Sequence, residues 1–159
     1  MSASTTLDRI AADLVGMKVG HLWRGYGSAI FLELGALSLG RARRDGSPGN
    51  PVGELTIAIQ WSWRIENATS IVCGSWSEED LWEPAFQLVR NSSVSGLSTF
   101  GRIPEVDLAL TDGLHLTSFM TAEGQPAWSL TDRRAKPHIW VIVRDGVLFA
   151  GDGTGPRDS

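Results

Sequence analysis

The clearest feature of the chain is a strict alternation of apolar and polar residues from position 55 to position 65. The apolar positions that would share one face are Leu55, Ile57, Ile59, Trp61, Trp63 and Ile65. A period of two is typical of a strand with one buried face. We therefore expect one long half-buried strand here, with Trp61 and Trp63 turned inward.

Shorter apolar runs separated by turn residues predict further strands on both sides of this one. They lie at 28–34, 70–73, 106–112, 128–130, 139–143 and 147–150. Asp112-Gly113 and Asp145-Gly146 are typical of tight turns between antiparallel strands. The strands on either side of each of these two turns are therefore expected to form a hairpin.

Helical spacing of apolar residues predicts two short helices. The first covers about 5–15, with Thr5 as its N-cap, and the second covers about 78–90, after Ser77. Pro84 conflicts with a full-length second helix, because proline lacks an amide hydrogen and crowds the preceding turn. The second helix should therefore begin properly near Pro84 or bend there.

The two halves of the chain echo each other. Trp63 and Ile65 match Trp140 and Ile142 when the second half is laid over the first. We therefore expect an α+β fold, mainly antiparallel β, built from two pseudo-repeated four-stranded β-meanders at about 18–75 and 95–152. They would pack as a sandwich or close into a barrel, with a helix before each. The prediction is a single domain over 1–159, with a loose tail at 151–159.

Composition narrows the classes of function. The net charge is −4, which argues against a nucleic-acid-binding protein, since such surfaces are normally basic. The first residues lack the pattern of a signal peptide, and the apolar run at 139–143 is far shorter than the ~20 residues of a membrane span. We expect a cytoplasmic protein that binds neither nucleic acid nor a membrane.

Candidate catalytic groups are few, and no metal site or cofactor is predicted. The three histidines are widely spaced, and the single cysteine, Cys73, lies in an apolar run typical of an inert core residue. Asp107 and His115 could be cross-strand neighbours, and Glu33 lies in the matching hairpin of the first half. A carboxylate that orients an imidazole can serve acid–base chemistry, but the same residues on amphipathic strands would simply face solvent. The sequence leaves both interpretations open.

Tryptophans near strand ends or a helix start are the best candidates for binding, because an exposed Trp near a loop is a common anchor for a partner. These candidates are Trp23, Trp76, Trp82 and Trp128, whereas Trp61, Trp63 and Trp140 are expected in the core. Two basic loops carry Arg41, Arg43 and Arg44, and Arg133, Arg134 and Lys136. Together they could form a positive patch for an anionic partner, or each could be a solvated loop.

Five short elements within residues 18–130 form a recognisable set, namely Ser28–Gly35, Trp63–Ile65, Asp107–Gly113, Phe119 and Trp128–Leu130. Together they resemble small bacterial β-rich proteins of unknown function, some of them immunity-protein-like. The resemblance implies no catalytic residues, and the acidic charge suits an immunity-type protein that faces a basic toxin.

Two functional hypotheses follow. The first is a non-enzymatic binding module, immunity-like in its most specific form, that binds a protein partner or a second copy of itself. The alternative is a small-ligand-binding β-barrel, or an enzyme, that uses a Trp-lined pocket with Asp107, His115 and Glu33.

Overall fold

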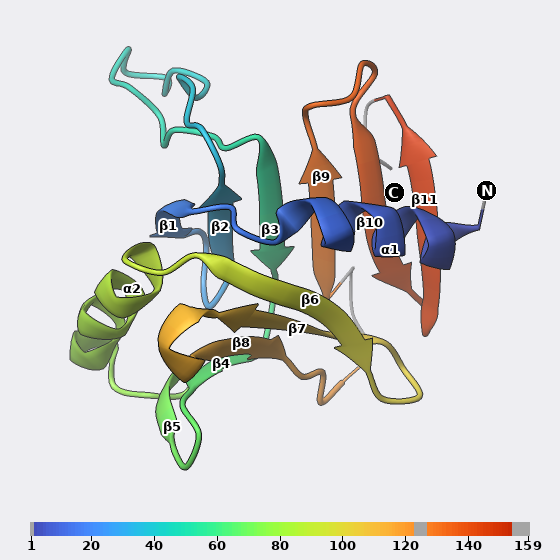
Figure 1. The fold of residues 1–159 in the computed structure, drawn as a ribbon. Coiled ribbons are helices and arrows are strands. Elements are labelled where there is room, and N and C mark those ends of the chain that lie inside the picture. Colours follow the sequence, from blue (N-terminus) through green and yellow to red (C-terminus); the bar gives the residue numbers. More distant parts are fainter. Residues whose placement is uncertain (1, 123–126, 154–159) are drawn as a thin grey trace.

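The computed structural model describes residues 2–122 and 127–153. Over these ranges the chain forms two antiparallel β-sheets and two α-helices (Figure 1). The large sheet has the strand order β1-β2-β3-β9-β10-β11, and the small sheet has the order β5-β4-β8-β7-β6. The predicted α+β class, mainly antiparallel with two short helices, is confirmed.

The strands of the two sheets run in different directions. The large sheet contains β1 (Val19–Arg24), β2 (Ile30–Leu34), β3 (Leu55–Ile59), β9 (Trp128–Asp132), β10 (Ile139–Arg144) and β11 (Val147–Asp152). The small sheet contains β4 (Trp63–Glu66), β5 (Ile71–Gly74), β6 (Val94–Phe100), β7 (Glu105–Leu110) and β8 (His115–Ser118). In Figure 1 β2, β3, β9, β10 and β11 stand upright, and β4, β6, β7 and β8 lie across beneath them. Neither sheet closes on itself within the described residues, so of the two predicted forms the chain adopts layers and not a barrel.

Helix α1 (Ala3–Leu14) bridges the two sheets, because it packs against β6 of the small sheet and against β10 and β11 of the large one (Figure 1). Its apolar stripe of Leu7, Ile10 and Leu14 is buried. The N-cap is Ser2, whose hydroxyl accepts a hydrogen bond from the amide of Thr5 at 3.1 Å. The predicted cap at Thr5 is therefore wrong by three residues.

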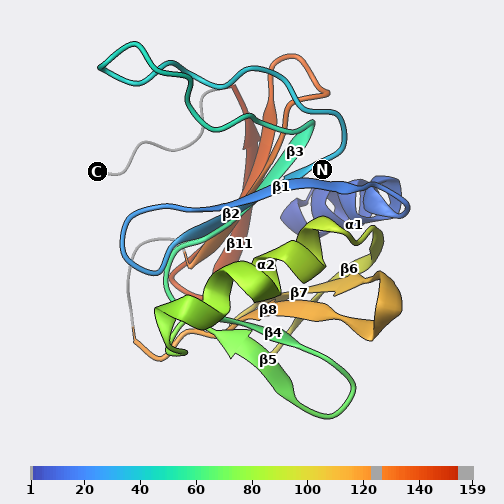
Figure 2. The same ribbon diagram turned by 90° about the vertical axis from the view of Figure 1, so that its left-hand side faces the viewer.

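Helix α2 (Trp82–Arg90) follows a short 3-10 turn, η1 (Glu79–Leu81), and packs against β1 and β5 (Figure 2). Pro84 lies in the first turn of α2, where no amide hydrogen is needed for the helix, so the helix begins close to the predicted place. Ser77 does not cap it, since its hydroxyl instead accepts from the amide of Gly74 at 2.9 Å. Neither described helix is long and apolar enough to cross a membrane.

One hydrophobic cluster joins both sheets and both helices, and tryptophans lie at its centre. Trp63 and Trp128 are completely buried. The indole N–H of Trp63 donates to the carbonyl of Ser28 at 2.7 Å, and that of Trp128 donates to the carbonyl of Pro104 at 3.0 Å. The apolar rings are therefore buried without an unsatisfied polar atom.

The predicted long strand is wrong in one respect, because the alternating segment belongs to two sheets. β3 ends at Ile59 and β4 begins at Trp63, and the residues between them cross from the large sheet to the small one. At the crossover the amide of Gln60 donates to the carbonyl of Ala127 at 2.8 Å. The period of two continues through the crossover, but the surroundings of the side chains change there.

The sequence predicts one four-stranded meander in each half of the chain, but the strands are divided differently. The large sheet takes three strands from each half, and the small sheet takes two from the first and three from the second. Trp63 lies in β4 of the small sheet, while its proposed counterpart Trp140 lies in β10 of the large sheet. The matched residues therefore do not occupy equivalent positions.

The two predicted tight turns are confirmed. Asp112-Gly113 and Asp145-Gly146 all have positive φ, and they join β7 to β8 and β10 to β11. Consecutive positive φ values match the right-handed twist of the strands that such turns connect. The tail predicted at 151–159 begins inside β11, which continues to Asp152. Its last residues, 154–159, lie outside the described ranges.

Candidate functional site

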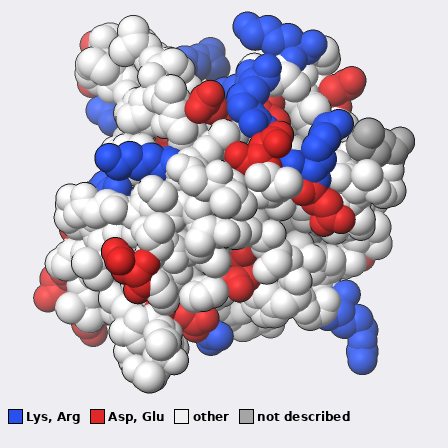
Figure 3. Space-filling view, in the orientation of Figure 1, with Lys and Arg blue, Asp and Glu red and all other residues white. Residues whose placement is uncertain are grey.

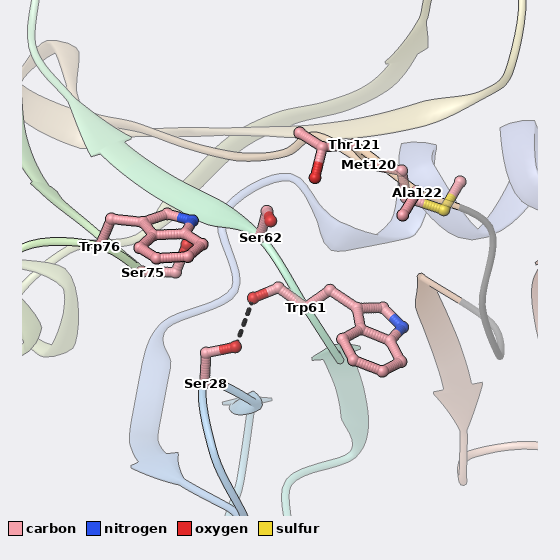
Figure 4. Close-up of a pocket in the computed structure, with 8 residues that line it drawn as sticks. All are labelled: Ser28, Trp61, Ser62, Ser75, Trp76, Met120, Thr121 and Ala122. Atoms are coloured by element: carbon pink, nitrogen blue, oxygen red, sulfur yellow. Dashed lines mark hydrogen bonds between the residues drawn. The ribbon is translucent and has the colours of Figure 1, made fainter.

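A pocket of 320 Å³ opens where the chain passes between the two sheets (Figure 4). Its walls come from the β1–β2 turn, the β3–β4 crossover, the turn after β5 and the segment after β8. These walls contain Ser28, Trp61, Ser62, Ser75, Trp76 and the segment 120–122. In Figure 4 the two tryptophans lie on opposite sides of Ser62. We call this site the Trp61–Trp76 pocket.

Trp61 is held at the pocket through its backbone, and the residue is 51% exposed. The hydroxyl of Ser28 donates to the carbonyl of Trp61 at 2.6 Å, and the carbonyl of Ser28 accepts the indole N–H of Trp63. The amide of Phe119 donates to the carbonyl of Ser62 at 3.1 Å. The crossover is therefore tied to the β1–β2 turn and to the segment after β8, which fixes one wall of the pocket.

Trp76 forms the opposite wall and is 90% exposed. It lies in a turn in which the amide of Ser77 donates to the carbonyl of Gly74 at 3.0 Å. The amide of Ser75 donates to the carbonyl of Trp63 at 2.9 Å. The turn is thus hydrogen-bonded on both sides of Trp76, so a large apolar ring is presented to solvent from an ordered backbone.

Among the residues that the structure describes, the pocket walls carry hydroxyl groups and no charged side chain. Ser28 uses its hydroxyl for Trp61, and the Ser75 hydroxyl accepts from the amide of Trp63 at 3.3 Å. The hydroxyls of Ser62 and Thr121 make no hydrogen bond to any residue in the described ranges. Apolar walls with a few polar groups suit an uncharged ligand, because an unpaired ion would lose its hydration there.

Asp107 and His115 meet as predicted, but they lie away from this pocket. The Nδ1 atom of His115 lies 2.9 Å from an Oδ1 of Asp107, on neighbouring strands β7 and β8. Their side chains are 27% and 40% exposed and alternate with buried leucines, so they face outward from the small sheet. The pair orients an imidazole without placing it beside the pocket.

Glu33 lies on the other sheet, in a buried polar cluster. It accepts a hydrogen bond from the Thr56 hydroxyl, to which the Arg133 guanidinium also donates. Burial raises the pKa of Glu33 above its usual range, and the hydrogen bond from Thr56 and the charge of Arg133 oppose this rise only in part. The prediction that Glu33, Asp107 and His115 share a Trp-lined pocket is therefore wrong, because none of them lines it.

The candidate tryptophans have different environments. Trp82 and Trp128 are 5% and 0% exposed, so their prediction as surface anchors is wrong. Trp23 stacks on Phe31 with ring centroids 4.2 Å apart and is half-buried. Trp76 has the exposure expected of an anchor, and its role in binding stays a prediction.

Two tryptophans predicted in the core are not enclosed by it. Trp61 is half exposed in the pocket, and Trp140 is half-buried against the backbone of Gly151. A methyl group at Gly151 would lie 2.3 Å from the Trp140 ring, so the glycine gives the ring its place on the sheet. Only Trp63 of the three predicted core residues is fully enclosed.

The two basic loops differ in what their arginines contact. Arg134 pairs with Asp132 at 2.9 Å and with Asp13 of α1 at 3.1 Å. Burial alone would raise the pKa of Asp132, but the hydrogen bonds and charge of Arg134 hold it below its usual range. With Arg133 bound to Thr56, both guanidinium groups already have partners within the chain, although Arg134 itself is exposed.

Arg41, Arg43 and Arg44 are exposed on the long loop between β2 and β3, which projects at the top of Figure 2. Basic side chains on the face drawn in Figure 3 lie in several places, some beside acidic ones. The loop arginines therefore remain candidates for binding by themselves, without Arg133 and Arg134.

Metal and thiol chemistry find little support in the described ranges. No group of three or more His, Cys, Asp or Glu side chains there could hold a metal ion. Cys73 is buried as predicted, and burial raises the pKa of its thiol, which disfavours the reactive thiolate. No protein-family model, curated protein or solved structure matches the chain.

Sequence reasoning missed Trp61 as a pocket residue and missed the serines and the segment 120–122 altogether. One signal was present for Trp61, since eleven alternating residues exceed the usual strand length of about five or six. A break in the middle of that run is therefore unsurprising. The other wall residues follow no period, and only the tertiary fold brings them together.

Proposed function

We propose that this chain is a non-enzymatic binding module that holds an apolar side chain of a protein partner in the Trp61–Trp76 pocket. The observation that carries the proposal is the pair of tryptophans, 51% and 90% exposed, on either side of a hollow whose described walls carry no charge. Aromatic anchors of this kind dominate the energetics of many protein interfaces. A volume of 320 Å³ is at the small end for a ligand site and suits one large side chain.

The non-enzymatic part of the proposal rests on the chemistry of the walls. The described wall residues offer no carboxylate, imidazole or thiol that could transfer a proton or attack a substrate. The net charge of −4 favours a basic partner, as expected for an immunity-like bacterial protein of the cytoplasm.

A small neutral ligand is the second candidate. The hydroxyls of Ser62 and Thr121, which make no hydrogen bond to a described residue, lie beside the aromatic walls. Polar groups at apolar walls fix the orientation of small ligands, and a neutral sugar offers both a face and hydroxyl groups.

Saturation-transfer NMR with three probes tests both candidates. The probes are N-acetyl-tryptophanamide, N-acetyl-leucinamide and methyl β-glucoside. We expect transfer to the two amides, and loss of that transfer in Trp61→Ala and Trp76→Ala. Leu39→Ala is the matched control, because Leu39 is 94% exposed and lies outside the pocket.

The outcomes separate the candidates. Transfer to the glucoside alone, dependent on Trp61 and Trp76, would establish the small-ligand function in place of the protein partner. Transfer that is the same in both variants as in the unmodified chain would show that the pocket is not the binding site.

A further inference from the structure

Two further hollows adjoin the Trp61–Trp76 pocket, one on each side. The first, of 280 Å³, shares Ser75 and Trp76 with the pocket and extends to Ile71 and Phe119. The second, of 390 Å³, shares the segment 120–122 and extends to Ile103. Because the central pocket has a wall in common with each neighbour, the three hollows lie in series along one groove.

Hollows that lie in series suit an extended polypeptide. Alternate residues of an extended chain point to the same side and lie about 6.6–6.8 Å apart. A segment that follows the groove can therefore place three alternate side chains in the three hollows. Each end of the groove has an exposed isoleucine beside a charged residue. Ile71, 60% exposed, lies at one end with Arg64, and Ile103, 47% exposed, lies at the other with Asp145.

The first hollow also lies against an edge strand. Its walls include Ile71 and Gly74 of β5, and β5 pairs only with β4 among the described strands. An edge strand presents unpaired backbone groups, and extended peptides commonly bind by hydrogen bonding to such groups.

The charge beside Trp76 indicates the character of the occupant. Glu78, Glu79 and Asp80 follow Trp76 within four residues and are all exposed. Glu79 pairs with Arg24 at 2.9 Å, whereas Glu78 and Asp80 form no ion pair with a residue in the described part of the chain. This surface is complementary to a cationic side chain.

We infer that the groove binds an extended segment of a basic partner protein, with large apolar side chains at alternate positions and a Lys or Arg near Trp76. The inference rests on the proposed function, because the central side chain must occupy the Trp61–Trp76 pocket. It adds the conformation, the pattern and the charge of the bound segment.

Selection of a phage-displayed library of random dodecapeptides on the full chain tests the inference. We expect enriched peptides with large apolar residues at alternate positions and a basic residue beside them. Synthetic versions should bind Trp76→Ala at least ~10-fold more weakly, as for a central aromatic anchor. Ile71→Ser and Ile103→Ser should each weaken binding about 3-fold, since rim contacts contribute less.

Two further variants complete the design. Glu78→Gln combined with Asp80→Asn should weaken binding and flatten its dependence on salt, because exposed charges are screened. Leu39→Ser should leave affinity unchanged, because Leu39 is exposed outside the groove.

Three results would overturn the inference in distinguishable ways. Peptides that need Trp61 and Trp76 but are indifferent to Ile71→Ser and Ile103→Ser would leave the proposed function and refute the extended segment. Peptides indifferent to Trp76→Ala would contradict both. A dimer in sedimentation velocity that Trp76→Ala abolishes would make a second copy of the chain the occupant.

Discussion

Trp61 and Trp63 are two residues apart on the same side of one alternating run, and yet they lie in opposite environments. Trp63 is fully buried, with its indole N–H bonded and Trp82 edge-on at 5.0 Å between ring centroids. Trp61 is 51% exposed at a pocket. The difference arises because the chain changes sheets between β3 and β4. Alternation determines which side a residue points to, but the tertiary fold determines what covers that side.

The same contrast separates the core from the seam, by which we mean the residues around the Trp61–Trp76 pocket where the chain passes between the two sheets. In the core, even a buried carboxylate is bonded: Glu105 accepts from the Ser118 hydroxyl at 2.7 Å and from the amide of Met120 at 3.0 Å. Where the chain passes between the sheets, the pocket is lined by two tryptophans and by four hydroxyl residues, of which Ser62 and Thr121 make no side-chain hydrogen bond to a described residue. Since Met120 lines that pocket, a bonded core residue holds one of its walls in place.

The largest effect on stability is expected when the buried tryptophan, Trp63, is replaced. Trp63→Ala should lower the free energy of unfolding by about 3–5 kcal/mol, because it leaves a large cavity and an unbonded Ser28 carbonyl. Trp61→Ala, the matched change two residues earlier, should cost less than about 1 kcal/mol. Urea denaturation followed by circular dichroism measures both. Equal losses would break the distinction between core and seam.

The buried carboxylate of Glu33 gives a smaller effect that depends on pH. Its pKa is raised in the folded state, so between the ordinary glutamate pKa, about 4.3, and the raised value the native state binds more protons than the unfolded state. The contribution of Glu33 to stability therefore falls as pH rises through that window, and Glu33→Gln should remove this slope.

Urea denaturation of the unmodified chain and of Glu33→Gln across this pH range measures the effect as a difference. Asp132 has a lowered pKa and produces the opposite slope at lower pH, so only the difference isolates Glu33. Glu78→Gln is an exposed control, and its curve of unfolding free energy against pH should run parallel to that of the unmodified chain. A parallel curve for Glu33→Gln would mean that this carboxyl group is not perturbed.

The smallest effect on stability is expected at the seam. Trp76→Ala should change the free energy of unfolding by no more than about 0.5 kcal/mol, because the residue is 90% exposed. The same substitution should abolish binding of the side-chain mimics. A loss above about 1 kcal/mol in urea denaturation would show that Trp76 stabilises the fold and is not reserved for a ligand.

The features predicted best from the sequence are those that depend on strands adjacent along the chain. Asp107 and His115 meet because a tight turn at Asp112-Gly113 brings their strands together, and both the turn and the contact depend on local spacing. Trp82 and Trp128 were misjudged because their covering groups come from distant segments. Trp82 packs on Trp63, and Trp128 bonds the carbonyl of Pro104.

The candidate site was the least predictable part for the same reason. Its four wall segments share no periodic pattern of apolar residues. Trp61 belongs to an alternating set whose other members are buried. Glu33 illustrates the converse, since its hairpin position was predicted but its partners Thr56 and Arg133 come from β3 and from the loop after β9. Local patterns describe strands well, whereas pockets and polar clusters depend on which strands become neighbours.

The most direct test of the account is a ¹⁵N NMR titration that follows the indole N–H signals of the seven tryptophans, assigned by Trp→Phe substitutions. N-acetyl-tryptophanamide is the added probe. The account predicts that the signals of Trp61 and Trp76 shift together and saturate with one affinity, while those of Trp63 and Trp128 stay in place. Shifts confined to other tryptophans, or no saturable shift at Trp61 and Trp76, would contradict it.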